Sequence, residues 1–156
     1  MDISAIMTTD LVTVGPEYNV ADVASLMDAR RIGSVIVLED DRVLGILTER
    51  DILRVVGAGE DPKNVAAHEA LTDDLIAIHP DASLEEAARE MTRARVRHLP
   101  VISDEGLVGI ISMRDLVRLS VRDMTEAGEP EHLELSKRVL SMVHRTEPAP
   151  PSGDNA

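Results

Sequence analysis

The chain has 156 residues, enough for one compact domain or for two small units that share a core. Its formal charge of -13 and its single aromatic residue, Tyr18, make nucleic acid an unfavourable partner, because the surface repels phosphates and offers no stacking platform. No cysteine is present, which excludes disulfides, thiolate zinc sites and cysteine nucleophiles, and no apolar run is long enough to span a membrane.

An internal repeat organises the chain. Residues 10–53 align with residues 74–117 at a constant offset of 64 and without a gap. The alignment contains twelve identities, whereas unrelated segments of this composition would share roughly three. The identical positions in the first copy are Asp10, Leu11, Pro16, Ala24, Met27, Arg31, Val37, Asp40, Gly45, Ile46, Arg50 and Asp51. We therefore expect the two copies to share one fold.

The first copy predicts five elements in chain order. A short extended run at 12–14 ends at a Gly-Pro turn, and a helix follows Asn19, which occupies the position of an N-cap. The helix is indicated by apolar residues at i, i+3, i+4 and i+7. Two hairpin strands at 34–38 and 43–47 flank an acidic turn, and a second helix begins near Thr48. The corresponding positions in the second copy are 76–78, Ser83, 98–102, 107–111 and Ser112.

Each copy is thus a β-α-β-β-α unit, and the fold class is mixed α/β (α+β). A unit of about 45 residues is too small to bury both faces of its sheet alone, so the copies should pack together. A short helix is expected at 65–71. The predicted boundaries are 3–56 for the first repeat, 57–66 for a linker, 67–122 for the second repeat, 129–145 for a C-terminal helix and 146–156 for a disordered tail.

A seven-residue pattern ends the hairpin of both copies, GILTERD at 45–51 and GIISMRD at 109–115. A hydroxyl residue followed three positions later by an acid can be a helix capping box, which needs no ligand, although capping boxes favour Glu or Gln over the Asp found here. The same hydroxyl and carboxylate at a helix N-terminus can hold the vicinal diol of a ribose, and the glycine would let a flat base approach the backbone. The two interpretations are compatible, and both stay open.

The order of elements, the doubled pattern and VRHLPV at 96–101 resemble a tandem pair of cystathionine-β-synthase (CBS) domains, known as a Bateman module. The resemblance covers roughly residues 3–122. It implies a pseudo-twofold pair whose central cleft binds up to two adenosine-containing ligands, such as AMP, ADP, ATP or S-adenosylmethionine, with no required cofactor. It also implies a homodimer that reports ligand occupancy to an unknown effector protein and has no catalytic activity.

The resemblance further implies two sites, each combining the ribose-binding acid of one repeat with groups from the other. The first site would contain Thr48 and Asp51 at the ribose, Ile46 and Pro80 beside the base, and Arg97, His98 and Arg114 near the phosphate. The second site would contain Ser112 and Asp115 at the ribose, Pro16 and Ile110 beside the base, and Ser34 and Arg50 at the phosphate end. Because only the first site receives the basic pair of VRHLPV, we expect it to bind charged nucleotides more strongly.

Three functional hypotheses follow. The favoured one is a stand-alone regulatory module that binds adenine nucleotides, the alternative is a ligand-free structural or interaction module that dimerises, and the least favoured is a small enzyme. The five histidines lack metal-ligand spacing and the sequence has no nucleophile elbow, so we expect neither a metal site nor catalysis. The first residues lack the basic region of a signal peptide, which favours a cytoplasmic protein.

Overall fold

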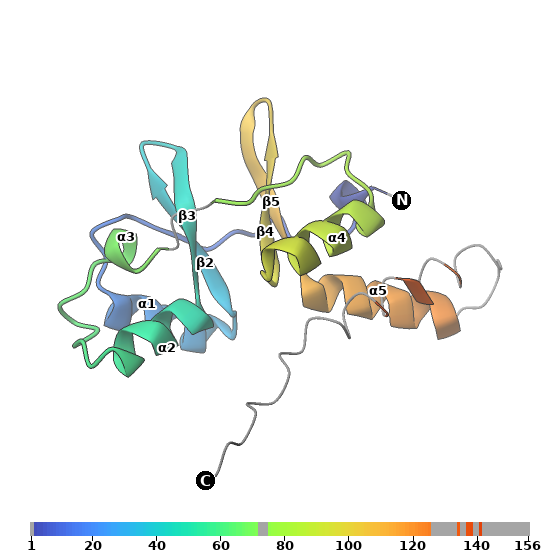
Figure 1. The fold of residues 1–156 in the computed structure, drawn as a ribbon. Helices are drawn as coiled ribbons and strands as arrows, with labels where there is room; N and C mark the ends of the chain where they lie inside the picture. Colours follow the sequence, from blue (N-terminus) through green and yellow to red (C-terminus); the bar gives the residue numbers. More distant parts are fainter. Residues whose placement is uncertain (1, 72–74, 126–133, 135–136, 139–140, 142–156) are drawn as a thin grey trace, which may run out of the picture.

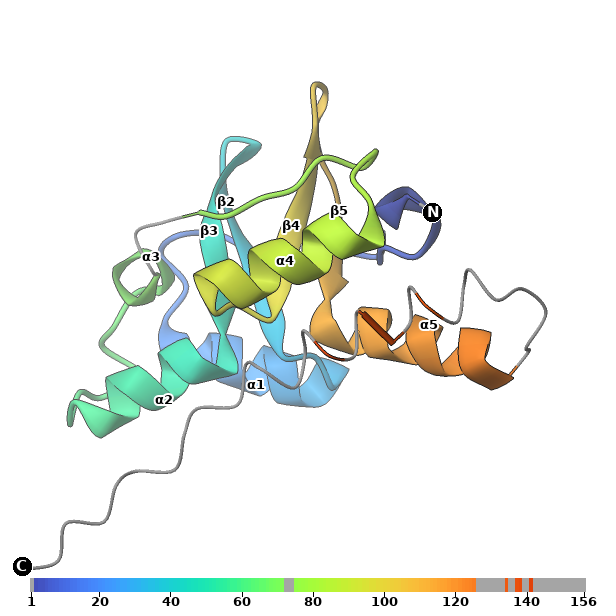
Figure 2. The same cartoon turned by 45° about the vertical axis from the view of Figure 1, so that its right-hand side comes forward.

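The computed structural model describes residues 2–71 and 75–125, together with positions 134, 137, 138 and 141. Two β-hairpins stand side by side at the centre, and helices pack around them (Figure 1, Figure 2), which confirms the predicted mixed α/β fold. Apart from the four isolated positions, the predicted helix at 129–145 and the tail at 146–156 lie outside the described residues. No helix in the described part of the chain has both the length and the apolar character needed to cross a membrane.

The first repeat has the predicted order of elements. These are β1 (Thr13–Val14), α1 (Val20–Arg30), β2 (Ser34–Glu39), β3 (Arg42–Thr48) and α2 (Glu49–Gly57). Strand β1 pairs in parallel with β2, and β2 pairs antiparallel with β3. The side chain of Asn19 caps α1 as predicted, because its Oδ1 accepts from the backbone N–H of Asp22 at 2.8 Å. The sheet register sets Ser34 opposite Thr48, so the start of β2 lies beside the start of α2.

The second repeat follows the same order with a shorter sheet. Its elements are α4 (Leu84–Ala94), β4 (His98–Ser103), β5 (Gly106–Ser112) and α5 (Met113–Thr125). The strand predicted at 76–78 is reduced to one parallel bridge between Ile78 and Val101. Ser83 caps α4, and its N–H and hydroxyl both donate to the carboxylate of Glu86.

The symmetry between the repeats extends to irregular features of the backbone. Helices α1 and α4 each end at an arginine in the left-handed conformation, Arg31 with φ 54° and Arg95 with φ 56°. The hairpins carry a register shift directly after Val37 and directly after Val101. Both pairs are 64 residues apart, so the repeats match even where the chain departs from regular geometry.

The N-terminal segment, residues 3–8, packs on the second repeat and not on the first. The short 3-10 helix η1 (Ile3–Ala5) places the fully buried Ile3 in the core of the second repeat, and the backbone N–H of Ile3 donates to the carbonyl of Ala82 at 2.9 Å. Thr8 then forms an antiparallel bridge with Ile110 of β5. The core of the second repeat is therefore incomplete without residues 3–8, which begin the sequence range of the first.

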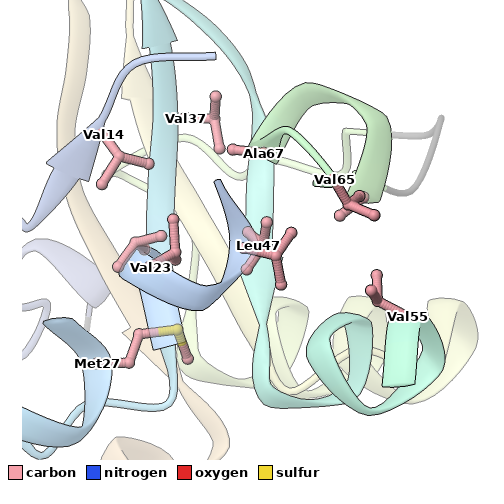
Figure 3. Close-up of a cluster of buried hydrophobic side chains, with 11 residues drawn as sticks. Val14, Val23, Met27, Val37, Leu47, Val55, Val65 and Ala67 are labelled. Atoms are coloured by element: carbon pink, nitrogen blue, oxygen red, sulfur yellow. The ribbon is translucent and has the colours of Figure 1, made fainter. Parts of the chain in front are cut away.

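The converse exchange completes the first repeat. The short helix expected at 65–71 is present as α3 (Ala67–Ala70), and Val65, Ala67 and Ala70 join Leu47 in the core of the first repeat (Figure 3). Each spatial unit therefore contains a segment from the sequence range of the other, residues 3–8 in the second repeat and α3 in the first.

The glycine of each seven-residue pattern touches one of these exchanged segments. A methyl group on Gly45 would lie 3.1 Å from both terminal carbons of Leu71. A methyl group on Gly109 would lie 2.7 Å from Sδ of Met7 and 3.1 Å from the backbone oxygen of Thr8. Close packing of the exchanged segments accounts for a glycine at both positions.

Adding a methyl group at these glycines should destabilise the fold unequally. We expect Gly109→Ala to lower the free energy of unfolding by about 1–3 kcal/mol, because backbone as well as a side chain would have to move. Gly45→Ala should cost less, since only the side chain of Leu71 is in the way. Urea denaturation measures both. Gly57→Ala at the end of α2 meets no atom within 4 Å and serves as the control; equal stabilities of the Gly109 and Gly57 variants would contradict the packing argument.

Candidate ligand-binding site

The first candidate site is built at the junction between β3 and α2. Asp51 is a buried residue, 4% exposed, and its Oδ2 accepts from the N–H of Thr48 at 2.7 Å and from the hydroxyl of Thr48 at 2.8 Å. Its Oδ1 lies 3.1 Å from Nη2 of Arg54, which also donates to the carbonyl of Ala70. The capping interpretation of TERD is therefore confirmed, and Arg54 links the cap to the exchanged helix α3.

The junction between β5 and α5 repeats this geometry. Oδ2 of Asp115 accepts from the N–H of Ser112 at 2.8 Å and from its hydroxyl at 2.5 Å. Within the described part of the chain, Oδ1 of Asp115 accepts no hydrogen bond. Oδ1 of Asp115 is therefore available to a ligand, whereas the equivalent Oδ1 of Asp51 faces Arg54.

A pocket of about 540 Å³ lies beside Asp51 and is lined by both repeats. The first repeat contributes the predicted residues Ile46, Thr48 and Asp51, together with Arg50 and Arg54. The second repeat contributes the predicted Arg97 and His98, together with Leu75, Ile76 and Arg95. Polar groups at the helix N-terminus thus face apolar and basic side chains from the other half of the chain.

A second pocket of about 640 Å³ lies beside Asp115. The second repeat contributes the predicted Ile110, Ser112 and Asp115, together with Arg114 and Arg118. The first repeat contributes the predicted Ser34, together with Leu11, Val12 and Arg31, and the N-terminal segment adds Thr8. Most of these positions are those of the first pocket displaced by 64 residues, so the two pockets are related by the pseudo-twofold symmetry of the repeats.

Four of the expected site residues are placed differently by the structure. Arg114 lines the second pocket instead of the first, and Arg50 lines the first instead of the second. Each arginine belongs to the first turn of the helix that carries the acid, so it stays in the pocket of its own repeat. Pro16 and Pro80 are absent from both linings, where Leu11 and Leu75 provide the apolar surface.

Arg97 and His98 line the second pocket as well as the first. The expected inequality between the sites assumed that this basic pair serves only the first, because in sequence the pair aligns with Gly33 and Ser34. The structure instead places the pair between the pockets.

Sequence reasoning missed several residues that line the pockets. The repeat-related pairs Arg31 and Arg95, and Leu11 and Leu75, line the pockets, although the sequence analysis assigned them no ligand-binding role. Both pairs are identities of the repeat alignment, and that was the available signal. Glu49 lines both pockets and had no such signal, because Met113 stands at the equivalent position.

Burial lowers the pKa of His98 below the ordinary value of 6.5. The carboxylates of Glu49 and Asp115 oppose this effect, whereas the guanidinium groups of Arg114 and Arg97 reinforce it. The imidazole is therefore predominantly neutral at pH 7, and its nitrogen atoms can donate or accept a hydrogen bond according to the tautomer. Among the described residues, no group of three or more His, Asp or Glu side chains is arranged to hold a metal ion.

The lowered pKa of His98 predicts a pH-dependent contribution to stability. The folded protein binds the proton of His98 less readily than the unfolded chain, so protonation favours unfolding. Stability is therefore lost as the pH falls through about 6.5 towards the lower pKa of the folded state. We expect His98→Gln to lose less stability than the wild type between about pH 7.5 and 5.5, as measured by urea denaturation across this range. A stability difference between the two proteins that does not change with pH would contradict the assignment.

The comparisons with known proteins agree with this doubled architecture. The CBS domain family matches the chain twice, at residues 3–58 and 67–122. The chain belongs to the CBS domain family. The CBS domain-containing protein YhcV of Bacillus subtilis is 36% identical over 111 residues, which is 70% of this chain and 79% of YhcV.

Solved structures show the same arrangement of a CBS pair. A signal-transduction protein with CBS domains from Burkholderia ambifaria, itself described as putative, has a TM-score of 0.75 and 32% identity over 79% of this chain and 96% of its own. The CBS domain pair of protein MJ0100, in complex with 5′-methylthioadenosine and S-adenosyl-L-methionine, has a TM-score of 0.70 over 76% of this chain and 98% of its own. At 21% identity, this second likeness supports the fold alone.

Proposed function

We propose that this CBS pair is a regulatory module that binds adenosine-containing ligands in the two pockets between its repeats. Adenine nucleotides (AMP, ADP or ATP) are the favoured ligands, and S-adenosylmethionine shares the adenosyl half. The observation that carries the proposal is the composition of each pocket: a hydroxyl-carboxylate pair at a helix N-terminus, with apolar side chains and arginines from the opposite repeat.

Each part of the pocket suits one part of such a ligand. A carboxylate offers about four acceptor positions, so a ribose diol can share it with the cap or, at Asp51, displace the half-exposed Arg54. The base would pack on side chains such as Ile46 and Ile76, and the arginines would pair with phosphate. A pocket rich in arginine is unusual on a chain with a net charge of -13, and it attracts anions locally.

A structural neighbour shows that a CBS pair of this fold can bind adenosyl compounds. The CBS pair of MJ0100 was solved with two adenosyl compounds bound, and its fold matches the present one with a TM-score of 0.70. A carboxylate at the helix N-terminus would recognise the ribose that those compounds share with AMP and ATP.

Occupancy can be transmitted because both repeats line both pockets. A ligand that contacts both repeats stabilises one relative arrangement and shifts the population towards it. The exposed apolar side chains of Leu53 and Val56 on α2, 71% and 55% exposed, offer a surface for a second copy or for an effector protein. We propose a homodimer whose effector protein responds to this arrangement, with no catalysis by the module itself.

A ligand-free dimerisation module is the alternative. The capping contacts of Asp51 and Asp115 favour it, since they give both residues a structural role without any ligand. The exposed apolar positions of α2 are equally compatible with a purely structural interface.

Thermal stability with and without nucleotide separates the two functions. A genuine site raises the melting temperature progressively with ligand concentration. At a ligand concentration of a hundred times Kd, the free energy of unfolding increases by about 2.7 kcal/mol. We expect AMP and ATP to stabilise the wild type, and Asp51→Asn and Asp115→Asn each to reduce the effect. Asparagine keeps an oxygen for the cap but loses the charged acceptor for the diol.

Glu86→Gln is the matched control. Glu86 accepts from Ser83 in a capping box with the same contacts, but it lines neither pocket. This variant should keep the full response to nucleotide, and all variants should be compared with their own ligand-free melting temperatures. A wild-type melting temperature that does not change at millimolar AMP, ATP and S-adenosylmethionine would favour the ligand-free alternative.

A further inference from the structure

Among the residues that the structure describes, four line both pockets and form what we call the shared wall: Gly33, Glu49, Arg97 and His98. Two equivalent strand-to-helix junctions build it. The backbone N–H of Glu49 donates to the carbonyl of Gly33 at 3.2 Å, and the N–H of Met113 donates to the carbonyl of Arg97 at 2.8 Å. The wall therefore stands where the two repeats meet across their pseudo-twofold axis.

The side chains of the shared wall break the symmetry of the repeats. Each polar residue has a small or uncharged residue 64 positions away. The pairs are Glu49 with Met113, Arg97 with Gly33, and His98 with Ser34. A methyl group on Gly33 would lie 3.6 Å from both Oε2 of Glu49 and Cε1 of His98, so these side chains occupy the space beside the glycine.

Crowding at the axis explains this asymmetry. Equivalent long side chains close to a twofold axis would compete for the same volume, so one member of each pair must be short. As a result, the two pockets share one guanidinium, that of Arg97, and one carboxylate, that of Glu49. With exact symmetry, each pocket would have a guanidinium and a carboxylate of its own.

We propose that the shared wall couples the two pockets, so that one phosphorylated ligand disfavours a second while an uncharged adenosyl ligand can still enter. The inference rests on the function proposed above. A ligand with its ribose at Asp51 or Asp115 and its base on apolar side chains directs its 5′ end to the remaining polar lining, which includes the wall. The first phosphate would pair with Arg97, and the second would meet a neutralised cation and the carboxylate of Glu49.

Each pocket also has cations of its own, Arg50 in the first and Arg114 in the second. The second phosphorylated ligand therefore binds more weakly than the first but is not excluded. Repulsion between the phosphates and the loss of a common cation predict that the second AMP binds on the order of tenfold more weakly than the first. Adenosine carries no charge, and its two binding events should be nearly independent.

Calorimetric titration with 5′-AMP and with adenosine, and native mass spectrometry to count bound ligands, test the coupling. The wild type should bind one AMP strongly and a second weakly, and AMP-loaded protein should still bind adenosine. The decisive variants are Asp51→Asn and Asp115→Asn. If the pockets are coupled, each variant retains one pocket that binds AMP about as strongly as the first event in the wild type.

Two further variants address the wall itself. Arg97→Gly introduces the residue found at the equivalent position of the first repeat, Gly33. This variant should bind the first AMP more weakly and show a smaller difference in affinity between the first and the second AMP. Glu49→Gln should strengthen the binding of AMP by on the order of three- to tenfold and change the binding of adenosine much less, because adenosine carries no charge. Glu105→Gln removes the same charge at the exposed β4–β5 turn, outside both pockets, and should change neither ligand.

The outcomes separate the coupling from the proposed function. Two equal and independent AMP sites, with adenosine also bound, would overturn the coupling and leave the function intact. The coupling would also be overturned if one of the two aspartate variants bound AMP only as weakly as the wild type binds its second AMP. That result would indicate pockets that are unequal but uncoupled. Failure of both AMP and adenosine to bind would overturn the proposed function and the coupling together.

Discussion

The structure depends on the packing of each exchanged segment against a glycine of the opposite hairpin. Met7 packs against Gly109, and Leu71 packs against Gly45. Each hydrophobic core contains residues from the sequence range of the other repeat, so neither range has a complete core of its own. The pockets lie between the two repeats that these contacts hold together.

The strand-to-helix junctions serve structure and recognition with the same atoms. Asp51 and Asp115 satisfy the backbone at the start of a helix, which is sufficient reason for an acid at these positions. The junction also holds a negative charge at a fixed point of a pocket whose other charged groups are mostly arginines. A cap that is needed for folding is thus already oriented for a ligand, and little additional ordering is required on binding.

Symmetry and its local failure have different consequences for function. Far from the symmetry axis the two repeats keep equivalent residues, and they form two pockets with equivalent hydroxyls, carboxylates and arginines. Close to the axis there is room for only one of two equivalent long side chains, so the residues of the two repeats differ. Glu49 aligns with Met113, and Arg97 aligns with Gly33. The differences lie at the shared wall, where a charge acts on both pockets at once.

The sequence by itself determined the repeat, the order of elements, the helix caps and the two hydroxyl-acid pairs, because these follow from local periodicity and from patterns within a few residues. It placed the acids of both pockets correctly as partners of Thr48 and Ser112. Only the tertiary structure decided that residues 3–8 complete the second repeat, that Arg50 and Arg114 stay with their own helices, and that Arg97 and His98 face both pockets. Those facts depend on how two bodies cross at a shared axis, and no short-range pattern in the chain encodes that crossing.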